Sequence, residues 1–134
     1  KIAEEQIKLL AADMSAEYEK GNYVICGGDF NKDLHGNAED IFGISGENYT
    51  WAQPFPTELI KEMPISLVVP YDEDNPVPSC RNADGPYNEN QFVLTVDGFI
   101  VSENVEVTET NVVDAEFKYS DHNPVYMKFK LLDE

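Results

Sequence analysis

The sequence is short of positive charge. Its 134 residues contain 9 lysines and arginines against 26 aspartates and glutamates, a formal net charge of −17 at pH 7. Such a charge repels polyanions at long range, so the composition argues against a surface that grips duplex nucleic acid. A bound cation can invert the potential locally, however, so the net charge does not exclude a binding site for a phosphate group.

Cysteines and long apolar runs are also scarce. Cys26 and Cys80 are the only cysteines. Two cysteines do not make a disulfide framework, and the sequence does not decide whether these two form a disulfide bond. Cys26 falls in an apolar run and is interpreted as a small buried residue, whereas Cys80, between Ser and Arg in a proline-rich segment, could be exposed. No stretch approaches the length of a membrane span, and no signal peptide is recognisable.

The size and apolar content suit one globular domain, because 42% of the 134 residues are hydrophobic. The chain starts at Lys1 and not at Met. We therefore expect it to begin inside a longer protein, with any targeting segment upstream. We find no internal repeat and no low-complexity tract.

The first predicted elements are a helix and a strand. Apolar residues recur at three- and four-residue steps over residues 3–18, and Gly21 provides a stop. The apolar run from Tyr23 then ends at Gly27 and Gly28, which predicts a short buried strand.

Two short helices are predicted in the irregular region that follows. The first covers residues 38–42, with Asn37 as its cap and Gly43 as its stop. The second covers residues 57–63 and begins at a Thr57 cap.

Proline dominates the middle of the chain. Seven of the eight prolines fall between Pro54 and Pro86, and proline lacks the N–H group that a central strand needs. We interpret residues 52–90 as a long surface loop, of the kind that is usually functional or mobile.

Three further strands are predicted near the carboxyl end. Residues 92–101 are apolar on both alternating faces, as in a central strand, apart from an acid at Asp97 that needs a partner. Residues 104–110 alternate and are expected to pair with that strand through a turn at 103–104. Residues 125–131 alternate as the last strand.

Polar side chains stand at the ends of these strands. Asp29 and Asn31 follow the first strand, at the edge where α/β sheets bind ligands. The alternative is an Asx-turn, in which both side chains bond only the nearby backbone. His122 lies in a short polar turn between Asp121 and a proline, whereas His35 is interpreted as structural.

Three motifs in this order resemble a known superfamily. They are Gly-Asp-Phe-Asn at 28–31, Val-Asp-Gly-Phe-Ile-Val-Ser at 96–102 and Ser-Asp-His-Asn-Pro at 120–124. Together they look like the last three motifs of the endonuclease/exonuclease/phosphatase superfamily, which includes pancreatic deoxyribonuclease, sphingomyelinases and inositol polyphosphate phosphatases. The resemblance covers nearly the whole chain, with 52–90 as its variable part.

The resemblance implies a fold and a reaction. The fold would be α/β (α+β), the carboxyl-terminal half of a four-layer α/β sandwich of the DNase I-like type, with mostly antiparallel sheets and flanking helices. Residues 1–134 would be part of one domain whose amino-terminal half precedes Lys1. The activity would be that of a Mg²⁺- or Mn²⁺-dependent phosphoesterase.

The resemblance also implies roles for single residues. Asp29 would orient or deprotonate the attacking water, and Asn31 would donate to a phosphoryl oxygen. Protonated His122 would hold the scissile phosphate, with Asp97 keeping it charged. Asp121 would help to bind the metal or support the His122 loop. In-line displacement at phosphorus needs such an activated water, a cation and oriented donors.

Two departures from the family pattern matter. Gly98 stands where the family has an aromatic or imidazole residue, which would enlarge the site or remove a contact. The family's main metal-binding glutamate belongs to the missing half. We therefore expect the chain alone to be inactive, and its exposed half-core to bind that half or a second copy of itself.

Arg81 and Trp51 are the only residues of their types. Arg81 suits phosphate binding, but a surface ion pair is the alternative. Trp51 could stack on a substrate or belong to the core or rim. The charge favours a small or lipid-derived phosphate ester over duplex nucleic acid. A non-catalytic binding or scaffold domain that keeps the fold is the alternative function.

Overall fold

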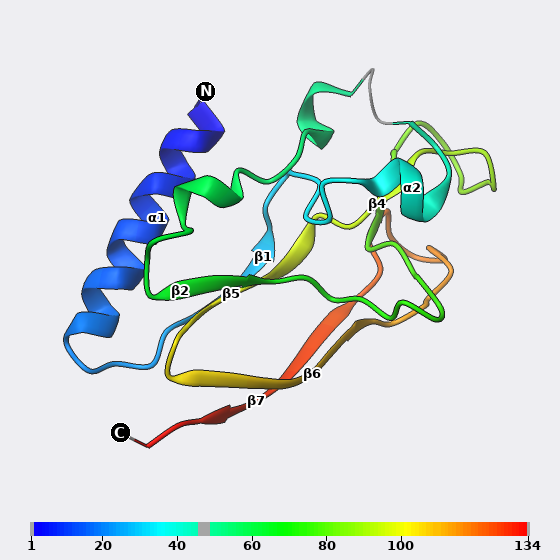
Figure 1. The fold of residues 1–134 in the computed structure, drawn as a ribbon. Helices are drawn as coiled ribbons and strands as arrows, with labels where there is room; N and C mark the ends of the chain where they lie inside the picture. Colours follow the sequence, from blue (N-terminus) through cyan, green and yellow to red (C-terminus); the bar gives the residue numbers. More distant parts are fainter. Residues whose placement is uncertain (1, 46–48, 134) are drawn as a thin grey trace.

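The computed structural model describes residues 2–45 and 49–133, and it is a mixed α/β structure with few helices and antiparallel sheets (Figure 1). The helical elements are α1 (Ile2–Glu19), α2 (Ala38–Phe42) and the single 3₁₀ turns η1 (Thr50–Ala52) and η2 (Thr57–Leu59). The strands are β1 (Ile25–Asp29), β2 (Ile65–Val68), β3 (Cys80–Arg81), β4 (Val93–Leu94), β5 (Asp97–Ser102), β6 (Val105–Val112) and β7 (Val125–Leu131). None of the described helices is long and apolar enough to cross a membrane.

Helix α1 confirms the amphipathic helix predicted at the start of the chain. It buries Ile7, Ala11 and Met14, one position per turn, on the face that packs against the sheet (Figure 1). Gly21 ends it with a φ of +91°, and its N–H donates to the carbonyl of Tyr18 over 2.8 Å.

Strand β5 is the centre of a three-stranded sheet in the order β1-β5-β2. Its Ile100 is fully buried and joins Ile7, Met14 and Ile65 in the core beneath α1. Burying an aliphatic side chain of this size contributes about 1.5–3 kcal/mol. This layer of helix and sheet is the main core of the described residues.

Strand β1 differs from the buried strand predicted from Tyr23. It begins two residues later, at Ile25, and most of it is exposed, because it is an edge strand. Gly27 and Gly28 lie inside the strand and do not end it. A Cβ at Gly27 would lie 3.0 Å from the Phe99 ring, so the close pairing with β5 explains a glycine there.

The prediction of one strand over residues 92–101, paired with 104–110, was wrong. That segment forms two strands, β4 and β5, because the carbonyls of Thr95 and Val96 between them accept hydrogen bonds from the loop after β1. Strand β6 pairs with β7. It has no place beside β5, because β1 and β2 already occupy both edges of β5.

Residues 52–90 are not only a surface loop. Strand β2 in this segment forms an edge of the main sheet, and Pro70 and Ser79 are fully buried. Cys80 is also buried, against the suggestion of an exposed thiol, and both cysteines are free. Proline excludes a strand from the middle of a sheet but not from its edge.

The two short helices differ in their caps. Helix α2 spans 38–42 as predicted, and Gly43 ends it in the left-handed conformation. Asn37, however, makes no side-chain cap bond; Asp33 Oδ2 accepts from the Ala38 N–H instead, over 3.0 Å. The helix predicted over 57–63 is only the 3₁₀ turn η2, preceded by Pro56.

Candidate active site

Asp29 and Asp97 lie directly opposite each other in neighbouring strands. Asp29 ends β1, Asp97 begins β5, and the antiparallel register pairs them. Opposed residues of an antiparallel pair share one face of the sheet, where two like charges repel. The carboxylates therefore need a positive group, and the imidazole of His122 lies beside both.

The backbone fixes the position of His122 from both sides. His122 forms an antiparallel bridge with Cys80, flanked by hydrogen bonds from Arg81 N to Asp121 O and from Asn123 N to Ser79 O. The His122 N–H also donates to Ser120 Oγ over 3.1 Å. This bridge places the cysteine and histidine side chains next to each other.

Acidic and thiol groups surround the imidazole. Nδ1 donates to Asp97 Oδ2 over 2.7 Å. Nε2 lies 3.8 Å from Asp29 Oδ2, 4.0 Å from Asp121 Oδ1 and 3.8 Å from Cys80 Sγ. The side chain of Asp97 is 14% exposed and that of Asp29 is 41% exposed. Asp97 is thus the more buried of these two carboxylates beside His122, and Asp29 is the more exposed one.

These neighbours change how His122 and Asp97 ionise. Burial lowers the pKa of His122, but the hydrogen bond and charge of Asp97 and the charges of Asp29 and Asp121 outweigh it, so the pKa is raised above 6.5. Burial raises the pKa of Asp97 above 3.8, against hydrogen bonds from His122 and Ser79. His122 therefore keeps a proton more readily than a free histidine does.

Asp29 and Asn31 form the Asx-turn that the sequence left open. Asp29 Oδ1 accepts from the Asn31 N–H over 2.8 Å, and Asn31 has a φ of +53°. This bond uses one oxygen of Asp29 and leaves Oδ2 facing His122 Nε2. The turn thus orients Asp29 and does not remove it from the site.

A cavity of about 270 Å³ opens beside these groups. Asp29, Asn31, Asp121 and His122 line it together with Arg81 and Trp51. Arg81 Nη1 donates to the carbonyls of Asn82 and Gly85, so the structure shows no ion pair for it among the described residues. Trp51 is half-buried and makes edge contacts with Tyr49 and Phe92.

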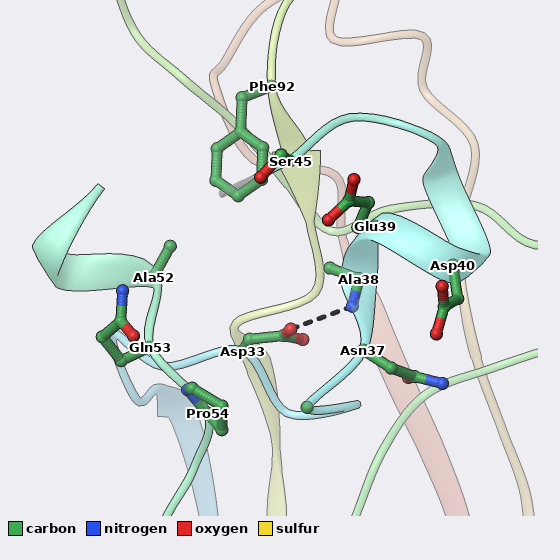
Figure 2. A pocket seen from close by; sticks show the side chains of 11 residues that line it. Asp33, Asn37, Ala38, Glu39, Asp40, Ser45, Ala52, Gln53, Pro54 and Phe92 are labelled. Carbon is green, nitrogen blue, oxygen red and sulfur yellow. Dashed lines mark hydrogen bonds between the residues drawn. The ribbon is translucent and has the colours of Figure 1, made fainter. Parts of the chain in front are cut away.

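A second pocket, of about 370 Å³, lies between α2 and η1 (Figure 2). Its buried acid, Asp33, already accepts from the N–H groups of His35 and Ala38. Its other acids, Glu39 and Asp40, are exposed. The smaller cavity at His122 is therefore the better candidate site, although the second one is larger.

Gly98 and His35 lie outside the site. A Cβ at Gly98 would come within 2.8 Å of the Val68 carbonyl oxygen and 2.7 Å of Leu34, on the face of β5 away from Asp97. The glycine thus permits close packing and does not enlarge the cavity. His35 packs against Tyr71 at 4.6 Å between ring centres, and burial lowers its pKa.

The donor set fits a hydrated divalent cation. Asp29, Asp97 and His122 each place a ligand atom within 4.8 Å of the other two. Mg²⁺ prefers oxygen ligands, keeps several waters and commonly uses one or two carboxylates. Asp97 is engaged with His122, so Asp29 Oδ2 and the 43% exposed carboxylate of Asp121 are the open oxygens.

Sequence reasoning missed the residues that support the site. Ser79 is fully buried, and its Oγ accepts from the N–H groups of Val96 and Asp97. Asn123 is 3% exposed, donates to the Pro78 carbonyl, and accepts from the N–H groups of Ala115 and Phe117. The only signal for Ser79 was a small polar residue beside a proline, whereas Asn123 stood in the third sequence motif without an assigned role.

Comparison of the chain with protein-family models, with curated proteins and with solved structures found no match.

Proposed function

We propose that the chain is the carboxyl-terminal half of a metal-dependent phosphoesterase of the endonuclease/exonuclease/phosphatase superfamily, with the four-layer DNase I-like fold completed by residues upstream of Lys1. The observation that carries the proposal is the 2.7 Å contact between His122 Nδ1 and Asp97 Oδ2, with Asp29 facing the other ring nitrogen. Each of the three sequence motifs supplies one member of this arrangement, namely Asp29, Asp97 and His122. Motif order and geometry therefore support the same reaction.

The chain's own residues have separate tasks in this reaction. Asp97 holds the imidazole and stabilises its charge, so that His122 Nε2 can donate to a phosphoryl oxygen. Asp29 Oδ2 accepts a proton from, or orients, the water that attacks phosphorus. Asn31 donates to another phosphoryl oxygen from the rim of the cavity.

Asp121 would hold Mg²⁺ or Mn²⁺. The bound ion would stabilise the charge that develops on the phosphoryl oxygens. The main glutamate ligand is proposed to lie upstream, so the 134-residue chain alone is expected to show no turnover.

The cavity suits a compact substrate. Arg81 lines it as a cation and Trp51 as a flat apolar surface. The net charge of −17 disfavours a polyanion. The proposed substrate class is therefore a small or lipid-derived phosphate ester, and duplex nucleic acid is disfavoured.

The test uses the full-length protein, assayed with Mg²⁺ on a chromogenic phosphomonoester and a chromogenic phosphodiester. His122→Ala and Asp29→Ala should each lower kcat by about 10²–10⁴-fold. Asp40→Ala, which changes an exposed acid outside the site, is the matched control and should leave kcat unchanged. Activity that survives both site substitutions would overturn the proposal.

A non-catalytic binding or scaffold domain is the second candidate. It is favoured by the Asx-turn, which gives Asp29 a structural task independent of chemistry. Full-length protein that shows no Mg²⁺-dependent hydrolysis, but melts at a lower temperature after Asp29→Ala, would support this alternative.

A further inference from the structure

We propose that Cys80, His122 and Asp29 form a binding site for a thiophilic divalent cation such as Zn²⁺ or Cd²⁺. This site differs from the oxygen-ligand Mg²⁺ site proposed above, because it uses the thiol and the imidazole. It does not depend on the phosphoesterase assignment. Only its effect on turnover, given below, rests on that proposed function.

Two cross-strand pairs place the ligand atoms. The antiparallel bridge sets Cys80 beside His122, and the register of β1 and β5 sets Asp29 opposite Asp97. The first pair supplies a sulfur and a nitrogen, and the second supplies a carboxylate oxygen. Because backbone hydrogen bonds fix both pairs, the main chain that carries the three ligands is in place before a cation binds.

The two distances from His122 Nε2 are close to those of a tetrahedral metal site, and the Cys80 thiol and the Asp29 carboxylate would move toward each other as the cation binds. Zn–S bonds of about 2.3 Å and Zn–N or Zn–O bonds of about 2.0–2.2 Å put two ligand atoms about 3.4–3.6 Å apart. His122 Nε2 lies 3.8 Å from Cys80 Sγ and 3.8 Å from Asp29 Oδ2. Asp121 Oδ1, at 4.0 Å, is placed to be a fourth ligand. Small side-chain movements toward the cation would complete the coordination.

The surroundings favour this class of cation. Asp97 accepts from Nδ1 and so directs Nε2 at the site, the arrangement that orients metal-bound histidines. A thiol and an imidazole select Zn²⁺ or Cd²⁺ over Mg²⁺. The cavity gives a path from solvent to the otherwise buried Cys80. On binding, Cys80 and a protonated His122 each release their proton to the solvent.

Zn²⁺ bound to His122 Nε2 would displace the proton that His122 donates to the phosphate in the proposed reaction. Under the proposed function, Zn²⁺ is therefore an inhibitor that competes with the substrate phosphate for His122. This consequence is separate from binding and is not needed for the test.

The test titrates Cd²⁺ and Zn²⁺ into the reduced 134-residue chain. We expect one ion per chain and an ultraviolet Cd–thiolate absorption band. Cys80→Ser should abolish the band and weaken binding at least about 100-fold, and Asp97→Asn should weaken it about 10–100-fold. Cys26→Ser is the matched control, because Cys26 is the chain's other free thiol, and it should leave the band intact.

A measurement on the unchanged chain covers the case that Cys80→Ser does not fold. By NMR, one equivalent of Zn²⁺ should shift the ring signals of His122 and not those of His35. The proposal is overturned if Cys80→Ser binds Cd²⁺ as tightly as the unchanged chain, if the band depends on Cys26, or if Zn²⁺ leaves the His122 signals unmoved. Failure of phosphoesterase assays would not affect any of these readouts.

Discussion

Asp97 Oδ2 and His122 Nδ1 lie 2.7 Å apart, although 25 residues separate them in the chain. Asp97 starts the central strand β5, and His122 sits in the turn before β7. The contact forms because the turn bridges to Cys80 while Ser79 Oγ bonds the Asp97 N–H. The same backbone arrangement therefore holds both Asp97 and His122 in position.

The pKa of His122 should lie above 6.5 when measured by NMR titration. Asp97, Asp29 and Asp121 stabilise its charged form more than burial destabilises it. Asp97→Asn removes the largest of these attractions, so the pKa should fall. His35, the only other histidine, is an internal control whose pKa should lie below 6.5 because it is half-buried. A His122 pKa at or below that of His35 would contradict this prediction.

The same shift gives a pH dependence of stability. A folded-state pKa above the unfolded value means that protonated His122 stabilises the fold below pH 6.5, and that this contribution is lost as the pH rises through the raised folded pKa. His122→Gln should therefore flatten the stability curve in that window, measured by urea unfolding at several pH values. An unchanged slope in the variant would show that His122 does not supply the effect.

Asp33, and not Asn37, should stabilise the start of helix α2. Asp33 is 6% exposed and its carboxylate accepts from two backbone N–H groups, whereas the Asn37 side chain makes no cap bond. Asp33→Ala should therefore lower the free energy of unfolding by about 1–2 kcal/mol, and the matched Asn37→Ala by much less. Equal losses in urea unfolding would indicate that the two side chains cap the helix alike.

Elements with their own periodicity were predictable from the sequence. Helix α1 and strand β7 lie within one residue of their predicted ranges, because the helical spacing in α1 and the alternation in β7 are local signals. The partner of β6 was not predictable, because it depends on which strand edges are free after β1 and β2 have paired with β5.

The residues of the candidate site also divide into those that could be predicted from the sequence and those that could not. Asp29, Asp97 and His122 could be selected from the sequence, because the motifs mark them, and the structure brings them together. Cys80 could not, because its place beside His122 depends on a backbone bridge across 42 residues. Its sequence context suggested exposure, whereas the tertiary packing around Leu94 and Phe92 buries it.

The chain should self-associate through the outer side of strand β7. Phe129 and Leu131 are 44% and 51% exposed, and β7 has a free edge among the described residues. Phe129→Ser should reduce association in sedimentation velocity runs at increasing concentration, whereas Leu9→Ser, which changes a 73% exposed residue of α1, should not. Added salt should strengthen association, because it screens the net charge of −17. A chain that stays monomeric at high salt and high concentration would contradict this prediction.

Gly98 should not tolerate even a methyl group. An alanine Cβ there would lie 2.8 Å from the Val68 carbonyl oxygen, which is backbone and cannot move independently of β2, and 2.7 Å from Leu34 Cδ1. Forcing the two strands apart should cost about 1–3 kcal/mol of unfolding free energy, measured by urea denaturation. Ser66→Ala, an exposed change in the neighbouring strand β2, is the control and should have little effect. If Gly98→Ala unfolds at the same urea concentration as the unchanged chain, β2 and β5 do not approach as closely as described, and the face of β5 opposite the Asp97 side chain has room for larger residues.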